Sequence, residues 1–219
     1  MQLHPMPEFG SFTLLLALAL SGYTLVMGGV ALWRTRGVAA GADRQSDKLG
    51  ETARRAGISS FIALSCAAFA LVWASFTNDY SVSYILHHTN RDLSTAYKFS
   101  ALWSGQEGSL LLWAWLLSAY GFVLRMRHKV DVRLTAFAST ILAGIQVFFL
   151  LLLNFAAPPF AIQPGPVAQD GFGLNPLLQY PEMVIHPPML YLGYVGFSVP
   201  FAFALGALMM RYPGEKWIH

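Results

Sequence analysis

A histidine followed by two prolines is the part of this sequence best suited to binding a metal. Pro187 and Pro188 come directly after His186. A helix tolerates proline in its first turn, because the backbone N–H groups there have no partner within the helix. The prolines therefore predict that a helix begins here and holds His186 at its mouth. The positive end of that helix disfavours a protonated imidazole. A neutral imidazole can coordinate a metal ion or a haem iron; the alternative is a histidine hydrogen-bonded to a loop carbonyl.

A second polar stretch, Trp103 to Ser109, lies at the edge of an apolar run and contains Gln106, Glu107 and Gly108. A carboxylate at such an edge is costly and is often functional. Glycine would let another backbone or a flat ligand approach closely. A negative charge in the first turn of a helix is also stabilised by the helix dipole. Two interpretations therefore stay open: a charge that caps a helix, or a segment that docks a partner or gates a ligand.

The remaining candidates are weaker. His87 and His88 are adjacent, and adjacent side chains point apart on most backbones, so we expect surface polar residues rather than a shared metal site. Cys66 is the single cysteine, which excludes an intramolecular disulfide and a metal centre of several cysteines.

The composition indicates an integral membrane protein. Of 219 residues, 55% are hydrophobic and only 11% are charged, whereas a soluble domain carries about 25% charged residues. The same composition excludes the disordered, collagen-like, coiled-coil and disulfide-rich classes of protein. The net charge of +3 then concerns orientation in the membrane, and we expect no nucleic acid as a partner.

Five apolar stretches are long enough, or nearly so, to cross a bilayer, which takes roughly 20 residues. We predict spans at about 9–33, 57–76, 99–124, 134–153 and 186–210. The third is the weakest, because its strongly apolar part is short. The sequence therefore predicts an all-α polytopic membrane protein, with residues 1–219 forming a single membrane domain.

The distribution of Lys and Arg predicts the orientation of these spans. Twelve of the fourteen fall in segments on one side, and only Arg91 and Lys98 fall on the other. We therefore expect the N-terminus outside, the C-terminus inside, and two outer loops at 77–98 and 154–185. The second loop is rich in Pro and Gly, which predicts a fixed irregular loop. On the inner side, a short amphipathic helix is expected around 47–56.

The chain resembles the N-terminal part of the CcmF family, the haem lyase subunits of bacterial cytochrome c maturation. The resemblance is carried by ALWSGQEGSLLLWAWLLS at 101–118 and by NPLLQYPEMVIHPPMLYLGYVGFSVPFAFALGALM at 175–209. FTNDYSVSYILHHTN, at 76–90, is similar to the first outer loop of the family. The resemblance covers essentially the whole chain. The related nitrite-reductase assembly proteins share these strings, so a paralogue also fits.

The resemblance implies a haem site on the periplasmic face of the bacterial inner membrane. Members of the family hold haem b, as substrate and as bound cofactor, between two external histidines and a Trp-rich loop. The first of these histidines lies in an H-P-P motif, which is His186 in this sequence. By the same resemblance, Pro187, Pro188 and Tyr191 support the site, and the only metal expected at His186 is haem iron.

Partners also follow from the resemblance. The family receives haem from the haem chaperone CcmE and attaches it to the thiols of a C-x-x-C-H motif in apocytochrome c, with apocytochrome-binding subunits of the CcmH and CcmI type. The Trp-rich loop and the second external histidine follow the fifth span in the family, whereas this chain ends at His219. We therefore expect them in a remaining C-terminal part of the same protein or in a split partner chain. Whether this chain alone is an enzyme stays open.

Two other functions are kept as alternatives. A scaffold subunit would dock the chaperone and the apocytochrome without touching iron, so it differs from a haem lyase component in whether His186 binds haem. A haem exporter would be expected to carry paired histidines on facing helices, and none of the six histidines falls within an apolar run. The haem lyase component is therefore the preferred interpretation.

Overall fold

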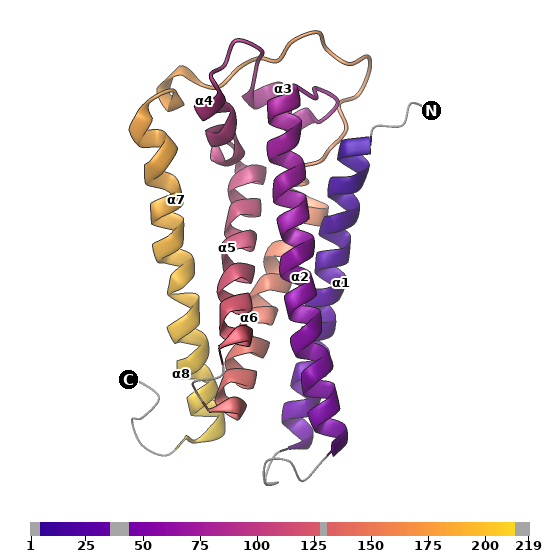
Figure 1. Cartoon of the computed structure of the whole chain (residues 1–219), viewed down its shortest axis with the longest axis vertical. Helices are drawn as coiled ribbons and strands as arrows, with labels where there is room; N and C mark the ends of the chain where they lie inside the picture. Colours follow the sequence, from indigo (N-terminus) through magenta and orange to yellow (C-terminus); the bar gives the residue numbers. More distant parts are fainter. Residues whose placement is uncertain (1–4, 36–43, 128–130, 213–219) are drawn as a thin grey trace.

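The computed structural model describes residues 5–35, 44–127 and 131–212 as a bundle of long helices (Figure 1). Five helical segments are long and apolar enough to cross a membrane. Within the described residues there is no β-strand, only an isolated bridge between Val82 and Ile162. The predicted all-α, five-span class is therefore confirmed. The elements in chain order are α1 (Pro5–Arg34), α2 (Arg44–Thr77), α3 (Ser83–His88), α4 (Thr95–Ser100), η1 (Ala101–Trp103), α5 (Gln106–Met126), α6 (Val132–Leu151), η2 (Leu152–Ala156), η3 (Pro176–Leu178), α7 (Pro181–Gly196) and α8 (Ser198–Met210).

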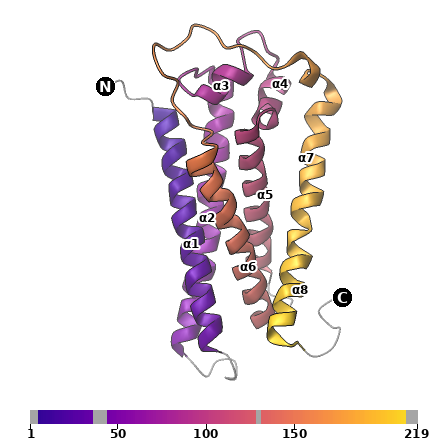
Figure 2. The same ribbon diagram turned by 180° about the vertical axis from the view of Figure 1, so that it is seen from behind.

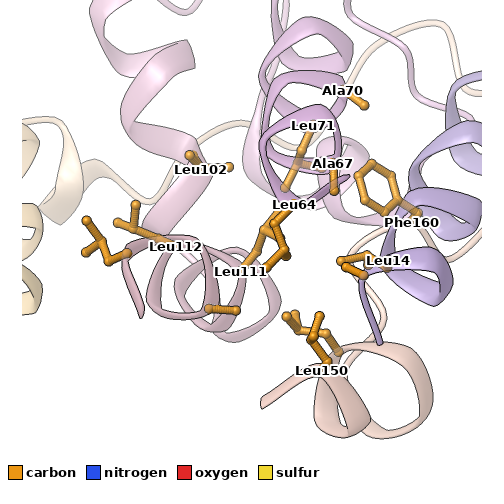
Figure 3. Packing of buried hydrophobic residues seen from close by; sticks show 14 of the residues in the cluster. Leu14, Leu64, Ala67, Ala70, Leu71, Leu102, Leu111, Leu112, Leu150 and Phe160 are labelled. Carbon is orange, nitrogen blue, oxygen red and sulfur yellow. The ribbon is translucent and has the colours of Figure 1, made fainter. Parts of the chain in front are cut away.

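The core lies between α1, α2, α5 and α6, and α7–α8 packs on the outside of α5 and α6. Helices in a bilayer associate through close packing of small residues. Helix α2 carries buried alanines at every third or fourth position, which form one stripe that allows close approach: Ala63, Ala67, Ala70 and Ala74. Larger side chains fill the space between the helices, including Leu14, Leu64, Leu111 and Leu150 (Figure 3).

Helix α2 begins at Arg44, well before the predicted span at 57–76. Glu51 pairs with Arg54 and with Arg55, each at 2.8 Å, and such pairs three and four residues apart stabilise a helix. The amphipathic helix expected around 47–56 is therefore the first part of α2 and not a separate element.

The predicted third span at 99–124 consists of three elements. Helix α4 and the 3-10 turn η1 come first, and α5 starts at Gln106. Gly105 between them has extended backbone angles, φ −121° and ψ 170°, and serves as the N-cap residue of α5. A single continuous helix is therefore excluded at this point.

The predicted start of the fifth span, at the proline pair, is wrong. Helix α7 begins with Pro181 in its first turn, so Pro187 and Pro188 lie inside the helix. Pro181, which also suits a helix start, lies five residues before His186. The same span bends at Phe197, between α7 and α8, because Pro200 has no N–H to donate to the carbonyl of Gly196.

The two predicted outer loops lie at the end of the bundle where α1 begins (Figure 2). The second loop crosses the first and is bound to it by backbone hydrogen bonds. Phe172 N–H donates to Leu86 O at 2.8 Å, and Gly173 N–H donates to Thr89 O at 3.0 Å. Between η2 and α7 the loop is irregular except for η3 and the bridge of Ile162 to Val82. These bonds fix its path over α3.

Candidate functional site

His186 is the sixth residue of α7, beyond the first turn. The influence of the helix dipole falls off within the first turn. The predicted effect of the helix N-terminus on the charge of this imidazole therefore does not apply, and the chemistry of His186 depends on its surroundings.

The imidazole of His186 lies exposed on the face of α7 that points away from the bundle. Glu182, Met189 and Leu190, which lie one turn before or after it, are also exposed. Gly193, two turns on, has nothing within 4 Å of the position that a Cβ would occupy. No residue in the described ranges hydrogen-bonds His186, so the predicted alternative of a bond to a loop carbonyl is not seen there. The residue is thus open to a ligand on this face of α7.

Trp103 connects the second predicted site segment to α7. Its indole N–H donates to the carbonyl of Met183 at 3.3 Å. In a regular helix that carbonyl would accept from the N–H of residue 187, but Pro187 has none. Trp103 therefore satisfies a backbone acceptor that the proline frees, and the turn that precedes His186 is held against η1.

Tyr191 faces α5 and not the side of α7 on which His186 lies. Its hydroxyl donates to Ser109 Oγ at 3.3 Å, and its ring meets that of Trp113 edge to face, with centroids 5.7 Å apart. The structure thus brings Tyr191 and Ser109 together, but it does not bring either to the imidazole of His186. These contacts fix α7 against α5.

Glu107 lies half-buried in the first turn of α5, and Gln106 beside it is exposed. The N-cap residue makes no side-chain capping bond, and Glu107 has no hydrogen bond to any residue that the structure describes. Its position fits a charge that acts on the helix dipole through space. A docking role for this carboxylate would use the part of its side chain that stays exposed beside Gln106.

Gly108 makes room for parts of the protein itself. A Cβ at this position would overlap Leu102 O and the Tyr84 hydroxyl. Tyr84 is buried; its hydroxyl lies 2.8 Å from Ala101 O and accepts from Gly105 N–H at 3.1 Å. Burial raises the pKa of Tyr84. The close approach inferred from the glycine is therefore that of a backbone carbonyl, Leu102 O, and of the Tyr84 side chain, which the sequence alone did not single out.

His87 and His88 do not share a metal site. The Nδ1 atom of His87 bonds Ser83 O at 2.7 Å, and that of His88 bonds Tyr84 O at 2.8 Å. The ring of His88 stacks on Tyr84 with centroids 4.2 Å apart. Within the described ranges no three His, Cys, Asp or Glu side chains are grouped to hold a metal ion. Both histidines thus take part in the structure of the outer loops.

Asp170 joins the two outer loops. Its carboxylate accepts from Tyr80 Oη at 2.9 Å, from Arg91 N–H at 3.0 Å and from Gly171 N–H at 2.8 Å. These bonds, that of Tyr80 first, hold the pKa of Asp170 below its ordinary value. Burial and then the bond to Asp170 raise the pKa of Tyr80 to about 12. We call Asp170 and its three donors the loop clasp.

The arrangement around His186 fits one side of a haem. The imidazole of His186 could hold haem iron from one side. The exposed apolar side chains of Met189 and Leu190 and the open surface at Gly193 would suit the flat, apolar face of a porphyrin. No second histidine of the described ranges lies on this face of α7, so a second ligand would have to come from elsewhere.

Comparison with known proteins gives the family. The profile described as "Cytochrome C assembly protein" matches residues 103–217. The chain is 41% identical to the cytochrome c-type biogenesis protein CcmF of Pseudomonas aeruginosa, over 96% of this chain and 31% of that protein. It is 32% identical to the cytochrome c-type biogenesis protein NrfE of Haemophilus influenzae, over 96% of this chain and 32% of that protein.

A solved structure agrees with these relatives. The structure titled "Cytochrome c Heme Lyase CcmF" matches with a TM-score of 0.78 and 27% identity, over 100% of this chain and 33% of that one. The chain spans about a third of the length of the relatives that it matches. The resemblance to CcmF inferred from the two sequence strings is confirmed, and the chain belongs to the cytochrome c assembly protein family.

Proposed function

We propose that this chain is a component of the haem lyase that matures c-type cytochromes, set in the bacterial inner membrane with the end that carries α3 and α4 facing the periplasm. The observation that carries the proposal is His186, an exposed imidazole without a hydrogen-bond partner in the described ranges, on an apolar face of a family member. His186 would supply one axial ligand to the iron of haem b.

The reaction that we propose needs little acid–base chemistry from this chain. Haem arrives from a chaperone of the CcmE type, and each thiol of a C-x-x-C-H motif adds across a haem vinyl group, sulfur to one carbon and a proton to the other. The task of this chain is to hold and orient the haem. Pro187 and Tyr191 contribute indirectly, since they fix α7 against η1 and α5 through Trp103 and Ser109.

The other parts of the machinery are proposed to come from elsewhere. They are the second axial ligand and Trp-rich loop, from a remaining part of the protein or a partner chain, and apocytochrome-binding subunits of the CcmH and CcmI type. The face of α7 around His186 is free to receive such parts, because His186, Met189 and Leu190 are exposed.

A scaffold role has one observation in its favour. Phe172 is 75% exposed and Leu177 is 81% exposed on the second outer loop, and exposed apolar side chains gathered on one loop are typical of protein contacts. A scaffold would dock partners through these side chains and would not need His186.

Replacement of His186 separates the two proposals. In cells whose c-type cytochromes depend on this protein, His186→Ala should abolish haem attachment while the protein stays in the membrane at normal abundance. His87→Ala, which removes an exposed imidazole at the same end of the bundle, is the matched control and should mature cytochromes normally. Normal maturation in the His186→Ala strain would favour the scaffold.

A further inference from the structure

We propose that the end of the bundle opposite His186 binds the phosphate group of an anionic membrane lipid. A cleft of about 430 Å³ lies there between α1, α2, α5 and α6. Four arginines line it, one from α2, one from α5, the C-cap residue of α5 and one from α6: Arg54, Arg125, Arg127 and Arg133. This site is independent of the haem proposal, since it uses other residues at the other end of the helices.

Arg125 is the most unusual of the four, because its side chain is buried inside the bundle. The residue is 7% exposed, and its Nη2 donates to Ser139 O at a long 3.3 Å. Gly57 makes room for it: a Cβ on Gly57 would overlap the guanidinium. A buried charge without a counter-charge is costly. The helices are thus shaped around a cation that forms no ion pair with a carboxylate of the described residues.

Three buried donors around the cleft have no hydrogen-bond partner in the described structure. They are Arg125 Nε, Arg133 Nε and Thr135 Oγ1, and all three residues line the cleft. Nearly all buried polar groups in proteins are satisfied, by protein, water or a ligand. An oxyanion can accept from several donors at once, and guanidinium groups bind phosphate with particular strength.

Among the described residues, the acidic side chains near the cleft pair with only one of these four arginines, Arg54. Glu51 is bound to Arg54 and Arg55. Asp131 accepts from the backbone N–H groups of Arg133 and Leu134 as the N-cap of α6. In the described part of the chain, neither Glu51 nor Asp131 forms an ion pair with the other three arginines: Arg125, Arg127 and Arg133. Asp47 also lines the cleft, which leaves four arginines against two carboxylates in its wall.

The setting of the cleft favours a lipid over free phosphate. It lies where α1 and α5 end and α2 and α6 begin, which is the level of lipid headgroups for helices that cross a bilayer. Its wall also presents apolar side chains suited to glycerol and the first acyl carbons: Ala31, Leu32, Leu124, Val132 and Ala136. A lipid with an anionic phosphate matches both parts of the wall.

Native mass spectrometry of the purified protein tests this site. Phosphatidylglycerol and phosphatidylcholine would be added in equal amounts to delipidated protein in neutral detergent. Phosphatidylglycerol should be retained at least tenfold better. The variant Arg127→Gln/Arg133→Gln, which leaves the buried Arg125 in place, should lose most of this preference. Lys48→Gln/Arg55→Gln removes two exposed charges of α2 outside the cleft and should keep it.

Thermal unfolding in the same detergent distinguishes lipid from free phosphate. Phosphatidylglycerol should raise the melting temperature of the wild-type protein, and inorganic phosphate with phosphatidylcholine should not. Equal retention of the two lipids would overturn the proposal. So would equal loss of the preference in both double variants, or a stabilisation by inorganic phosphate that matches that of phosphatidylglycerol.

Discussion

The indole N–H of Trp103 donates to the carbonyl of Met183, the acceptor that Pro187 leaves free in α7. A proline inside a helix removes a backbone hydrogen bond and is costly. Here a side chain 80 positions away in sequence supplies the missing donor. The same contact fixes the turn of α7 that leads to His186, so proline, tryptophan and histidine form one structural unit.

Replacement of Trp103 tests this relationship. Trp103→Phe keeps an aromatic ring but removes the N–H donor, so the stability of the protein should fall by about 1 kcal/mol. In a Pro187→Ala background the helix supplies its own donor to Met183 O, and the same change should cost clearly less. Thermal unfolding of the wild-type protein, the two single variants and the double variant gives the coupling free energy between Trp103 and Pro187.

Trp113→Phe is the matched control, since the indole N–H of Trp113 makes no hydrogen bond to the residues described. Its effect should be the same with and without Pro187. Additive effects of Trp103→Phe and Pro187→Ala would show that the hydrogen bond does not compensate for the proline.

The five apolar spans were predictable because their length and composition are local properties of the sequence. The start of the fifth was not. Pro187 and Pro188 suit a helix start as well as Pro181 does. The bond from Trp103 that satisfies Met183 O inside α7 joins distant parts of the chain, so no local pattern shows it. The break before α5 likewise depends on the extended backbone of Gly105, next to the buried Tyr84.

The sequence predicts only those residues of the candidate site that belong to a recognisable motif. His186 and the segment 103–109 were found from residue types and from family resemblance, and the structure connects this segment to α7 through Trp103 and Ser109. Tyr84 was missed because a tyrosine in a short outer segment has no pattern of its own. Arg125 was counted among the loop charges, whereas it is a buried residue of α5.

Glu107→Gln tests whether this carboxylate acts only on the α5 dipole. The position in the first turn predicts a loss of stability of about 1 kcal/mol or less, with cytochrome maturation in proportion to protein abundance. Glu8→Gln, in the first turn of α1, is the control and should behave alike. A large loss of maturation at normal abundance, for Glu107→Gln alone, would instead assign Glu107 to docking or gating.

The orientation predicted from Lys and Arg can be measured by labelling. Single cysteines at the exposed positions Ala96 and Gln169, in a Cys66→Ala background, should react with a membrane-impermeant thiol reagent in intact spheroplasts. A cysteine at the exposed position Lys48 should react only after lysis. Because Lys48 lies at the other end of the bundle, the reverse pattern would place His186 in the cytoplasm and end the periplasmic proposal.

The loop clasp predicts a pH dependence. The pKa of Asp170 is lowered in the folded protein from 3.8, so its contribution to stability is present above that value and is lost as the pH falls through the folded pKa. The pKa of Tyr80 is raised from 10.0 to about 12, so its contribution is complete below pH 10 and is lost near pH 12. Hydrogen exchange of the Phe172 and Gly173 amides should show this window of protection. Asp170→Asn should remove the loss of protection on the acid side, and an unchanged acid limit in that variant would exclude the clasp.

The central claim is that the imidazole of His186 coordinates haem iron, and chemical rescue tests it most directly. His186→Gly should abolish maturation of c-type cytochromes, measured by haem stain, because it removes the ligand and leaves space beside iron. Added imidazole should restore part of the maturation in this variant, and it should change nothing in a His87→Gly control. The account predicts this selective rescue at constant protein abundance. Normal cytochrome maturation by the His186→Gly protein without imidazole would contradict it.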